Sequence, residues 1–144
     1  ILSSIAIPQF ITAADKAKQK EASVLLASYV KAAQAYYTEY SSLAEYSSDL
    51  GQYISITGCS TAGADACKTE APVNLQNQDA TSWNTPSGLY AIGMNASGTQ
   101  VTFTANPTED FNGYAVAACF SSSNGVTRVV ESTQKGVAPT AECN

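Results

Sequence analysis

The sequence predicts an α+β fold in which a long N-terminal helix packs on a four-stranded antiparallel sheet, with a C-terminal region closed by a disulfide. Apolar residues recur at helical spacing through the first forty residues. Residues 88–131 instead form short runs of strand-like composition, separated by turn signals. An amphipathic helix and a half-buried sheet each need an apolar partner, so we expect the helix to cover one face of the sheet.

The chain of 144 residues is long enough for one domain with a substantial core. We divide this domain into a helix (1–40), an αβ-loop (41–87), a sheet (88–131) and a C-terminal tail (132–144). With 44% hydrophobic and 13% charged residues, the composition is that of a globular protein. The net charge of −5 argues against sequence-independent nucleic-acid binding, which needs lysine and arginine to neutralise phosphates.

Catalytic chemistry has little basis in this sequence. The chain contains no histidine, which removes the commonest general base and the commonest metal ligand. It also contains no glycine-rich phosphate loop and no G-x-S-x-G motif. We therefore expect a protein that is not an enzyme and that holds neither cofactor nor metal.

The helix is predicted over residues 1–40 because alanine is abundant, glycine is absent and apolar residues recur at steps of mostly three or four. The recurring positions are Phe10, Ala14, Ala17, Leu25, Tyr29, Ala33, Tyr36 and Tyr40. Thr12, followed three residues later by Asp15, is placed to cap the lysine-bearing part. From Phe10 onward such a helix would be roughly 45 Å long. We expect one end to project beyond the body or to pack against another molecule.

Pro8 separates the apolar residues 1–7 from the lysine-bearing segment. Inside a helix, proline removes one hydrogen bond and clashes with the preceding turn, which produces a kink or a break. At the first position of a helix, proline is well accommodated. The residues alone leave both alternatives open. The apolar run itself is too short to cross a bilayer, which takes about 20 residues.

The αβ-loop is rich in Ser, Gly, Asn and Thr. Residues 53–56 alternate and are expected to form a short strand that ends at Gly58. Trp83 is the one tryptophan of the chain, and we expect it to be buried and to pin the loop to the core.

The sheet is predicted to be a meander because its connections are short. The expected strands are residues 89–94, 100–104, 113–120 and 126–131, with turns at 95–98, 106–110 and 124–125. The last of these turns is Asn124-Gly125, a strong hairpin signal.

Four cysteines in a small chain rich in Ser, Thr and Asn favour two disulfides and an oxidising compartment. Three pairings are possible. The simplest joins Cys59 to Cys67, which bracket a loop of small residues, and Cys119 to Cys143, which ties the tail to the third predicted strand. In the chain-entropy model, closing the second loop is worth roughly 3 kcal/mol.

The N-terminal residues resemble those of a type IV pilin. The resemblance is carried by Ile1-Leu-Ser-Ser-Ile-Ala-Ile-Pro-Gln-Phe10, by the Ala-x-x-Lys-Ala-Lys pattern at residues 13–18, and by a long helix containing Ala-Tyr-Tyr at residues 35–37. It covers about the first forty residues, and the segment Ala-Gln-Ala-Tyr-Tyr is most similar to pilins of cyanobacteria. The remainder is similar only in its expected architecture and in the positions of two cysteines, Cys119 and Cys143.

The resemblance implies a structural subunit that polymerises through its N-terminal helix. Pilins carry a basic leader, which a peptidase removes before methylating the new N-terminus, and a glutamate in the apolar stretch. Neither feature matches a residue here, so the resemblance implies an N-terminally truncated form. Pro8 matches the proline near which the family's helix loosens in the filament. The implied packing residues are Ile1, Leu2, Ile5, Ile7, Pro8, Phe10 and Ile11.

The implied partners are further copies in a helical filament, the pilus assembly machinery, and the inner membrane that anchors the subunit before assembly. The implied location is the extracellular filament, and the implied roles are adhesion, twitching motility and DNA uptake, with surface or DNA contacts made through minor pilins. Two alternatives remain. One is a minor pilin or a pseudopilin of type II secretion. The other is a membrane-tethered module whose loop at residues 59–87 binds DNA or a glycan.

Lys16, Lys18 and Lys20 are candidates for contacts outside the chain. They could face anionic lipid headgroups, at roughly 1 kcal/mol per charge, or pair with acids of a neighbouring subunit. The third alternative is a solvated helix face balanced by Asp15 and Glu21.

Other candidate positions have simpler interpretations. Four helical tyrosines, at 29, 36, 37 and 40, are expected to pack on the sheet rather than to stack on a ligand. Glu109 and Asp110 are expected to be a solvated turn, because calcium needs six or more oxygen ligands. Asn95 begins a formal glycosylation sequon, and serines at 41–42 and 121–123 are candidates for O-linked sugars.

Overall fold

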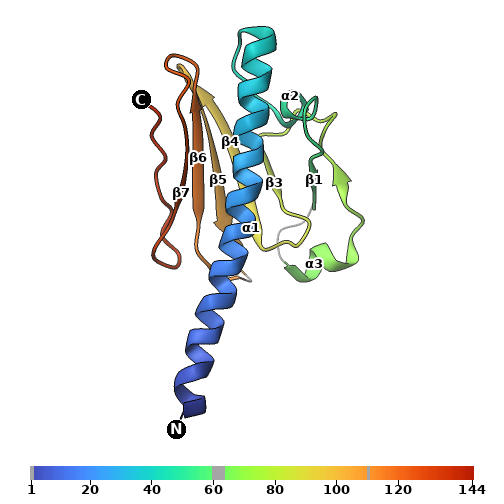
Figure 1. The fold of residues 1–144 in the computed structure, drawn as a ribbon. Coiled ribbons are helices and arrows are strands. Elements are labelled where there is room, and N and C mark those ends of the chain that lie inside the picture. Colours follow the sequence, from blue (N-terminus) through green and yellow to red (C-terminus); the bar gives the residue numbers. More distant parts are fainter. Residues whose placement is uncertain (1, 60–63, 110) are drawn as a thin grey trace.

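The structure is a computed structural model that describes residues 2–59, 64–109 and 111–144, with side chains described for residues 13–59, 67–109 and 111–144. Its helices are α1 (Leu2–Tyr40), α2 (Ser47–Leu50) and α3 (Ala64–Thr69). Its strands are β1 (Thr57–Gly58), β2 (Val73–Asn74), β3 (Ser82–Asn84), β4 (Tyr90–Ser97), β5 (Gln100–Pro107), β6 (Val116–Ser121) and β7 (Thr127–Glu131). As predicted, the fold is α+β, with one long N-terminal helix packed against an antiparallel sheet (Figure 1).

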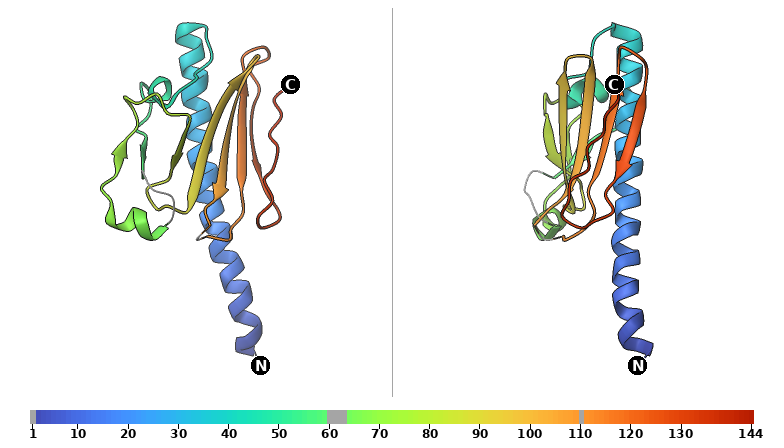
Figure 2. Two further views of the ribbon diagram at one scale, coloured as in Figure 1. Left: turned by 180° about the vertical axis from the view of Figure 1, so that it is seen from behind. Right: turned by 90° about the vertical axis from the view of Figure 1, so that its left-hand side faces the viewer.

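Helix α1 lies along one face of the sheet, and its N-terminal end continues beyond the sheet (Figures 1 and 2). It is a single helix that runs through Pro8 and Thr12. The alternative in which Pro8 begins the helix is therefore wrong, and so is the prediction that Thr12 caps its start. At the other end, Ser41 has a positive φ of 56° and its N–H donates to Tyr37 O at 2.8 Å. A left-handed residue after the last turn is a common way to end a helix.

The main sheet is a meander with the order β3-β4-β5-β6-β7, all antiparallel. It has five strands, where four were predicted from the sequence. The additional strand is β3, in which Trp83 pairs with Ile92 of β4. Three residues inside a loop rich in Ser, Asn and Pro are too few to show an alternating pattern, and pairing with β4 is what makes them a strand.

Three local predictions in and beside this sheet were wrong. The turn predicted at residues 106–110 does not begin at 106, because Asn106 and Pro107 belong to β5 and pair with β4. Residues 53–56 are not a strand; the short strand follows at Thr57–Gly58 and pairs with β2 outside the main sheet. Residues 95–97 do not form a turn but belong to β4, which pairs with β5 as far as Ser97 and Gln100. The turn lies between these two residues, where Gly98 has a positive φ of 59°.

Strand β6 is buried throughout because both of its faces are covered. Val116, Ala118 and Phe120 face α1 and belong to the main core. The alternate residue Cys119 packs with Cys143 in a second apolar cluster formed by the tail. The tail, residues 132–144, therefore covers the side of β6 that the helix leaves open.

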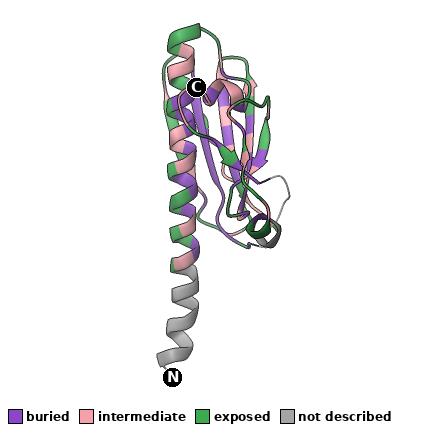
Figure 3. Cartoon of the chain, turned by 90° about the vertical axis from the view of Figure 1, so that its right-hand side faces the viewer, coloured by how far each residue is buried: buried purple, intermediate pink, exposed green. Residues whose placement is uncertain are grey.

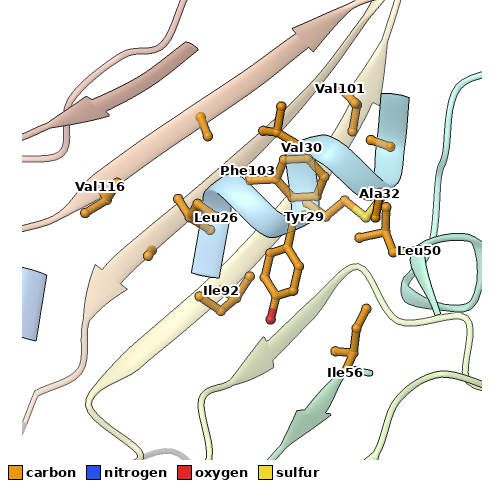
Figure 4. Close-up of a cluster of buried hydrophobic side chains, with 14 of the residues drawn as sticks. Leu26, Tyr29, Val30, Ala32, Leu50, Ile56, Ile92, Val101, Phe103 and Val116 are labelled. Atoms are coloured by element: carbon orange, nitrogen blue, oxygen red, sulfur yellow. The ribbon is translucent and has the colours of Figure 1, made fainter. Parts of the chain in front are cut away.

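The core centres on Tyr29 of α1, which lies between the helix and the sheet (Figure 4). Its ring centroid is 5.8 Å from that of Phe103 and 5.6 Å from that of Trp83. Trp83 is buried, as predicted, and its Nε1 donates to the Tyr29 hydroxyl at 3.3 Å. Burial raises the pKa of Tyr29 to about 12, partly offset by this hydrogen bond.

The remaining helical tyrosines differ from one another. Tyr37 packs on the sheet, with its ring centroid 5.9 Å from that of Phe120. Tyr36 is partly buried, and its ring centroid lies 4.7 Å from that of Tyr40. Tyr40 is 49% exposed, so the prediction that it packs on the sheet was wrong. The last turn of α1 extends past the sheet at the upper end of the molecule (Figure 1).

Two disulfides join Cys59 to Cys67 and Cys119 to Cys143, the simplest pairing that the spacing allowed. Both sulfur atoms of the second pair are inaccessible to solvent, since Cys119 and Cys143 are each 0% exposed.

Candidate functional site

The lower end of the sheet, where α1 leaves it, holds the densest group of polar contacts to the helix. Asp15, Gln19 and Ser23 face the sheet although their side chains are polar, and they are only 8%, 4% and 9% exposed. We call these three residues, each four positions from the next, the polar ladder. Residues four apart lie on the same face of a helix, so all three meet the same part of the sheet.

The middle residue of the ladder bridges two backbone segments. The Gln19 amide donates to Ser132 O at 2.8 Å and to Ala115 O at 3.2 Å. These carbonyls lie just before β6 and just after β7, and the Ser132 N–H also donates to Ala115 O at 2.9 Å. Gln19 therefore attaches the helix to both ends of one hairpin.

The other two residues of the ladder contact charged side chains of the same region. The Ser23 hydroxyl donates to Glu131 Oε1 at 2.7 Å, and Lys20 forms an ion pair with the same carboxylate at 2.8 Å. Asp15 forms an ion pair with Lys135 of the tail. The hydrogen bond from Lys20 lowers the pKa of Glu131, a hydrogen bond from Ser23 acts in the same direction, and burial opposes them.

The three candidate lysines have partners within the chain. Lys20 binds Glu131, whereas Lys18 Nζ lies 4.8 Å from the ring centroid of Phe111. Lys16 Nζ lies 5.8 Å from the ring centroid of Tyr114, and Lys135 contacts the same ring at the same distance. Cation–π contacts of this kind are worth about 0.5–1 kcal/mol at exposed sites. The Lys20 side chain remains 70% exposed, so these contacts leave its charge accessible to a second partner.

The polar ladder was not predicted from the sequence. Polar residues of an amphipathic helix are normally assigned to the solvent side, so the predicted stripe included Ala17, which is exposed. The buried stripe instead continues downward from Leu26 through the polar ladder (Figure 3). The available signal was the spacing of four between Asp15, Gln19 and Ser23, in register with the apolar residues above them.

The residues that the resemblance marks for filament packing lie outside the described side chains. They are Ile1, Leu2, Ile5, Ile7, Pro8, Phe10 and Ile11. The backbone from Leu2 onward belongs to α1. The chain thus places this candidate segment on the part of the helix that extends from the sheet (Figure 1).

The minor candidates are spread over other parts of the molecule. Glu109 is exposed after β5, and Asp110 lies outside the described residues. Asn95 is exposed on β4, and Ser41 and Ser42 are exposed after α1. Of the second serine group, Ser123 is exposed, Ser122 is half-buried and Ser121 is buried. No cluster of three or more His, Cys, Asp or Glu side chains suited to a metal occurs among the described residues.

A hollow of about 400 Å³ lies between the αβ-loop and the edge of the sheet at β3. Its lining includes Leu75 and Trp83, together with the polar side chains of Gln78, Ser82 and Asn84. Among the described residues that line it there is no lysine or arginine. This composition suits an uncharged polar ligand better than a phosphate.

Within the described part of the chain, no helix combines the length and the apolar character needed to cross a membrane. Comparisons with protein-family models, with curated proteins and with solved structures found no match to this chain.

Proposed function

We propose that this chain is a structural subunit of a type IV pilus, with the fold of a type IV pilin. The observation that carries the proposal is the division of α1 into two parts. One part packs on the sheet from Asp15 upward, and the other extends away from it as a helix. A lone soluble domain gains nothing from a projecting apolar helix end, whereas a subunit gains a surface to share with neighbouring helices.

Two further observations support this proposal. The disulfide between Cys119 and Cys143 ties the tail to the side of β6 that faces away from α1. The positions of these two cysteines are part of the resemblance to type IV pilins. The polar ladder attaches the base of the sheet to the helix. A force applied along α1 is therefore transmitted through buried contacts to the sheet and its loops, which together form the head of the subunit. In this proposal the mechanism is assembly, and extension and retraction are driven by partner ATPases.

The test uses the complete gene and the cell that carries it. We expect the sequence upstream of Ile1 to encode a short basic leader ending in Gly, then Phe or Met, with a glutamate a few residues on. We also expect surface filaments, seen by electron microscopy, to disappear when the gene is deleted and to return on complementation. An ordinary signal peptide upstream would refute the proposal.

If deletion of the gene removes the filaments but this chain is not their main component, the chain is instead a minor pilin. A type II secretion pseudopilin would affect protein export and leave the surface filaments intact. Quantifying the chain in purified filaments and in the secreted fraction separates these alternatives.

A second candidate function is favoured by the hollow beside β3. In that case the chain is a membrane-tethered module that binds a glycan through the αβ-loop, with the Trp83 region as its site. Binding of the isolated chain to DNA and to neutral oligosaccharides across a salt series separates the two ligands. Salt-sensitive DNA binding indicates phosphate contacts, whereas salt-insensitive sugar binding supports the hollow.

A further inference from the structure

Two exposed surfaces of opposite charge lie on opposite flanks of α1. The first, which we call the β7 groove, is a hollow of about 250 Å³ between the helix and β7. Val30 and Val129 form its apolar lining, and Lys31 and Arg128 give it positive charge. Val129 is 40% exposed, so the groove presents apolar surface to solvent. Among the described residues, neither Lys31 nor Arg128 forms an ion pair.

The second surface, which we call the apex patch, lies where α1 ends and α2 begins. It consists of Glu39, Tyr40, Glu45, Tyr46 and Asp49, and its two tyrosines are 49% and 38% exposed. Hydrogen bonds hold one of its acids in place: the Asp49 carboxylate accepts the backbone N–H groups of Glu45 and Tyr46 at 2.8 and 3.1 Å. The patch combines negative charge with exposed aromatic rings.

The two surfaces complement each other in both charge and composition. The β7 groove offers arginine, lysine and valine, whereas the apex patch offers carboxylates and tyrosine rings. Arginine and tyrosine are enriched in protein interfaces, and arginine also binds aromatic faces. One molecule cannot bring its own two surfaces together, because β7 and α2 lie on opposite sides of α1 (Figure 1; the reverse view is in Figure 2).

We propose that the β7 groove of one copy binds the apex patch of a second copy. This inference rests on the proposed function in taking a second copy as the partner. The contact is heterologous, because each molecule uses one surface for one neighbour and the other surface for the next. Such contacts propagate into a ring or an open helical filament rather than stopping at a dimer. Strand β7 is also an edge of the described sheet, and the neighbour would shield it.

The test uses two charge-reversed variants of the chain. One carries Lys31→Glu and Arg128→Glu in the groove, and the other carries Glu39→Lys and Glu45→Lys in the patch. In each variant alone, the groove and the patch carry charges of the same sign, which repel each other. We therefore expect its self-association constant at low ionic strength to fall about tenfold or more. Mixed together, the two variants restore opposite charges at every contact. We expect the mixture to recover the association of the unchanged chain, measured by sedimentation velocity.

A matched control reverses an acid elsewhere, as Glu109→Lys. Glu109 is exposed after β5 and lines neither of the two surfaces, so this variant should associate like the unchanged chain. A second measurement uses the unchanged chain alone. Carbodiimide cross-linking of mixed isotopically light and heavy chains should yield peptides that join Lys31 of one copy to Glu39 or Glu45 of another.

Failure of the mixture to recover association, or the absence of mixed-isotope cross-links at Lys31, would overturn this interface. Neither result would affect the upstream sequence or the filament-deletion test. Conversely, a restored mixture alongside an ordinary signal peptide would leave the interface standing and refute the pilin proposal.

Discussion

At the scale of single residues, the contacts that matter most are made by polar side chains on the buried face of α1. Gln19 is 4% exposed, and its amide donates to the backbone carbonyls of Ala115 and Ser132. Both of these residues are buried, so water does not easily replace the amide as a donor. Leaving buried acceptors without a donor costs more than an average hydrogen bond contributes. We therefore expect this one amide to stabilise the junction of helix and sheet more than Lys16, Lys18 and Lys20 around it.

We predict that Gln19→Leu lowers the free energy of unfolding by about 1–3 kcal/mol, because it takes the side-chain donor from the carbonyl of Ser132 and one of two donors from the carbonyl of Ala115. Denaturant unfolding followed by circular dichroism measures the change. Gln34→Leu is the matched control, since it makes the same replacement at an exposed position of the same helix and should change stability by less than about 0.5 kcal/mol. Equal effects of the two replacements would refute a special role for Gln19.

A second residue-scale prediction concerns Tyr29 at alkaline pH. Burial raises the pKa of Tyr29 from 10.0 to about 12, so the folded protein holds the phenolic proton more tightly than the unfolded chain does. The contribution of Tyr29 to stability is therefore constant below pH 10 and is lost as the pH rises from 10 to 12. At about 1.4 kcal/mol per pKa unit, Tyr29 accounts for a loss of roughly 2–3 kcal/mol.

Unfolding of the unchanged chain and of Tyr29→Phe at pH 9 and pH 11.5 tests this expectation. The variant is less stable at pH 9, because Trp83 loses its acceptor, and it should lose less stability between the two values. The fluorescence of Trp83 reports the lost contact directly, since no other tryptophan is present. A pH dependence identical in both proteins would show that Tyr29 does not titrate in this range.

At the scale of elements, the two disulfides stabilise the fold to different extents. Cys119 and Cys143 are 24 residues apart and join the tail to β6. Cys59 and Cys67 are 8 residues apart and close a local loop. A longer closed loop restricts the unfolded chain more, and the buried second cluster also depends on the tail staying in place.

We predict that replacing Cys119 and Cys143 together with alanine costs about 3–4 kcal/mol, and that replacing Cys59 and Cys67 costs about 1 kcal/mol less. Thermal unfolding of the two double variants gives the comparison. A larger loss from the pair in the αβ-loop would contradict the assignment of the tail to the sheet. Peptide mapping without reductant should recover both cross-linked pairs and no Cys59–Cys143 peptide.

The strands show how far local pattern predicts an element. Residues 100–104 and 126–131 alternate and flank clear turn residues, so their strands were predicted nearly as found, and both extend or start within three residues of the expected bounds. The sequence did not predict strand β3 or the pairing of β1 with β2, because two or three residues are too few to show an alternating pattern. Those strands are defined by pairing with a second strand, β4 for β3 and β2 for β1.

At the scale of the whole molecule, α1 serves two purposes along its length. Its described contacts with the sheet region begin at Asp15 and Lys16, whereas the helix itself begins at Leu2. Because the N-terminal end of α1 continues beyond the sheet (Figure 1), we expect the sheet and its loops to fold without the first residues of the helix. Tolerance of truncation depends on the burial and hydrogen bonding of what is removed.

We predict that a chain beginning at Ala13 keeps its stability within about 0.5 kcal/mol, whereas one beginning at Lys20 loses more than about 1.5 kcal/mol. The second truncation removes Asp15 and Gln19, and with them two of the polar attachments at the base of the sheet. Urea unfolding and amide NMR spectra of the two shortened chains provide the measurement. Unfolding of the chain that begins at Ala13 would show that the projecting part belongs to the head.

The sequence by itself determined the helix and most of the meander, because each depends on local period or turn chemistry. For the disulfides it favoured one of three pairings, and the structure shows that pairing. The sequence did not determine which face of α1 is buried near the base. Period alone assigns Gln19 and Ser23 to solvent, and only partners more than a hundred residues away reverse this. Tertiary structure also decided that β3 is a strand, and that the β7 groove and the apex patch lie on opposite flanks of one helix. These features arise from pairing and packing between elements, and such contacts leave no local pattern in a single sequence.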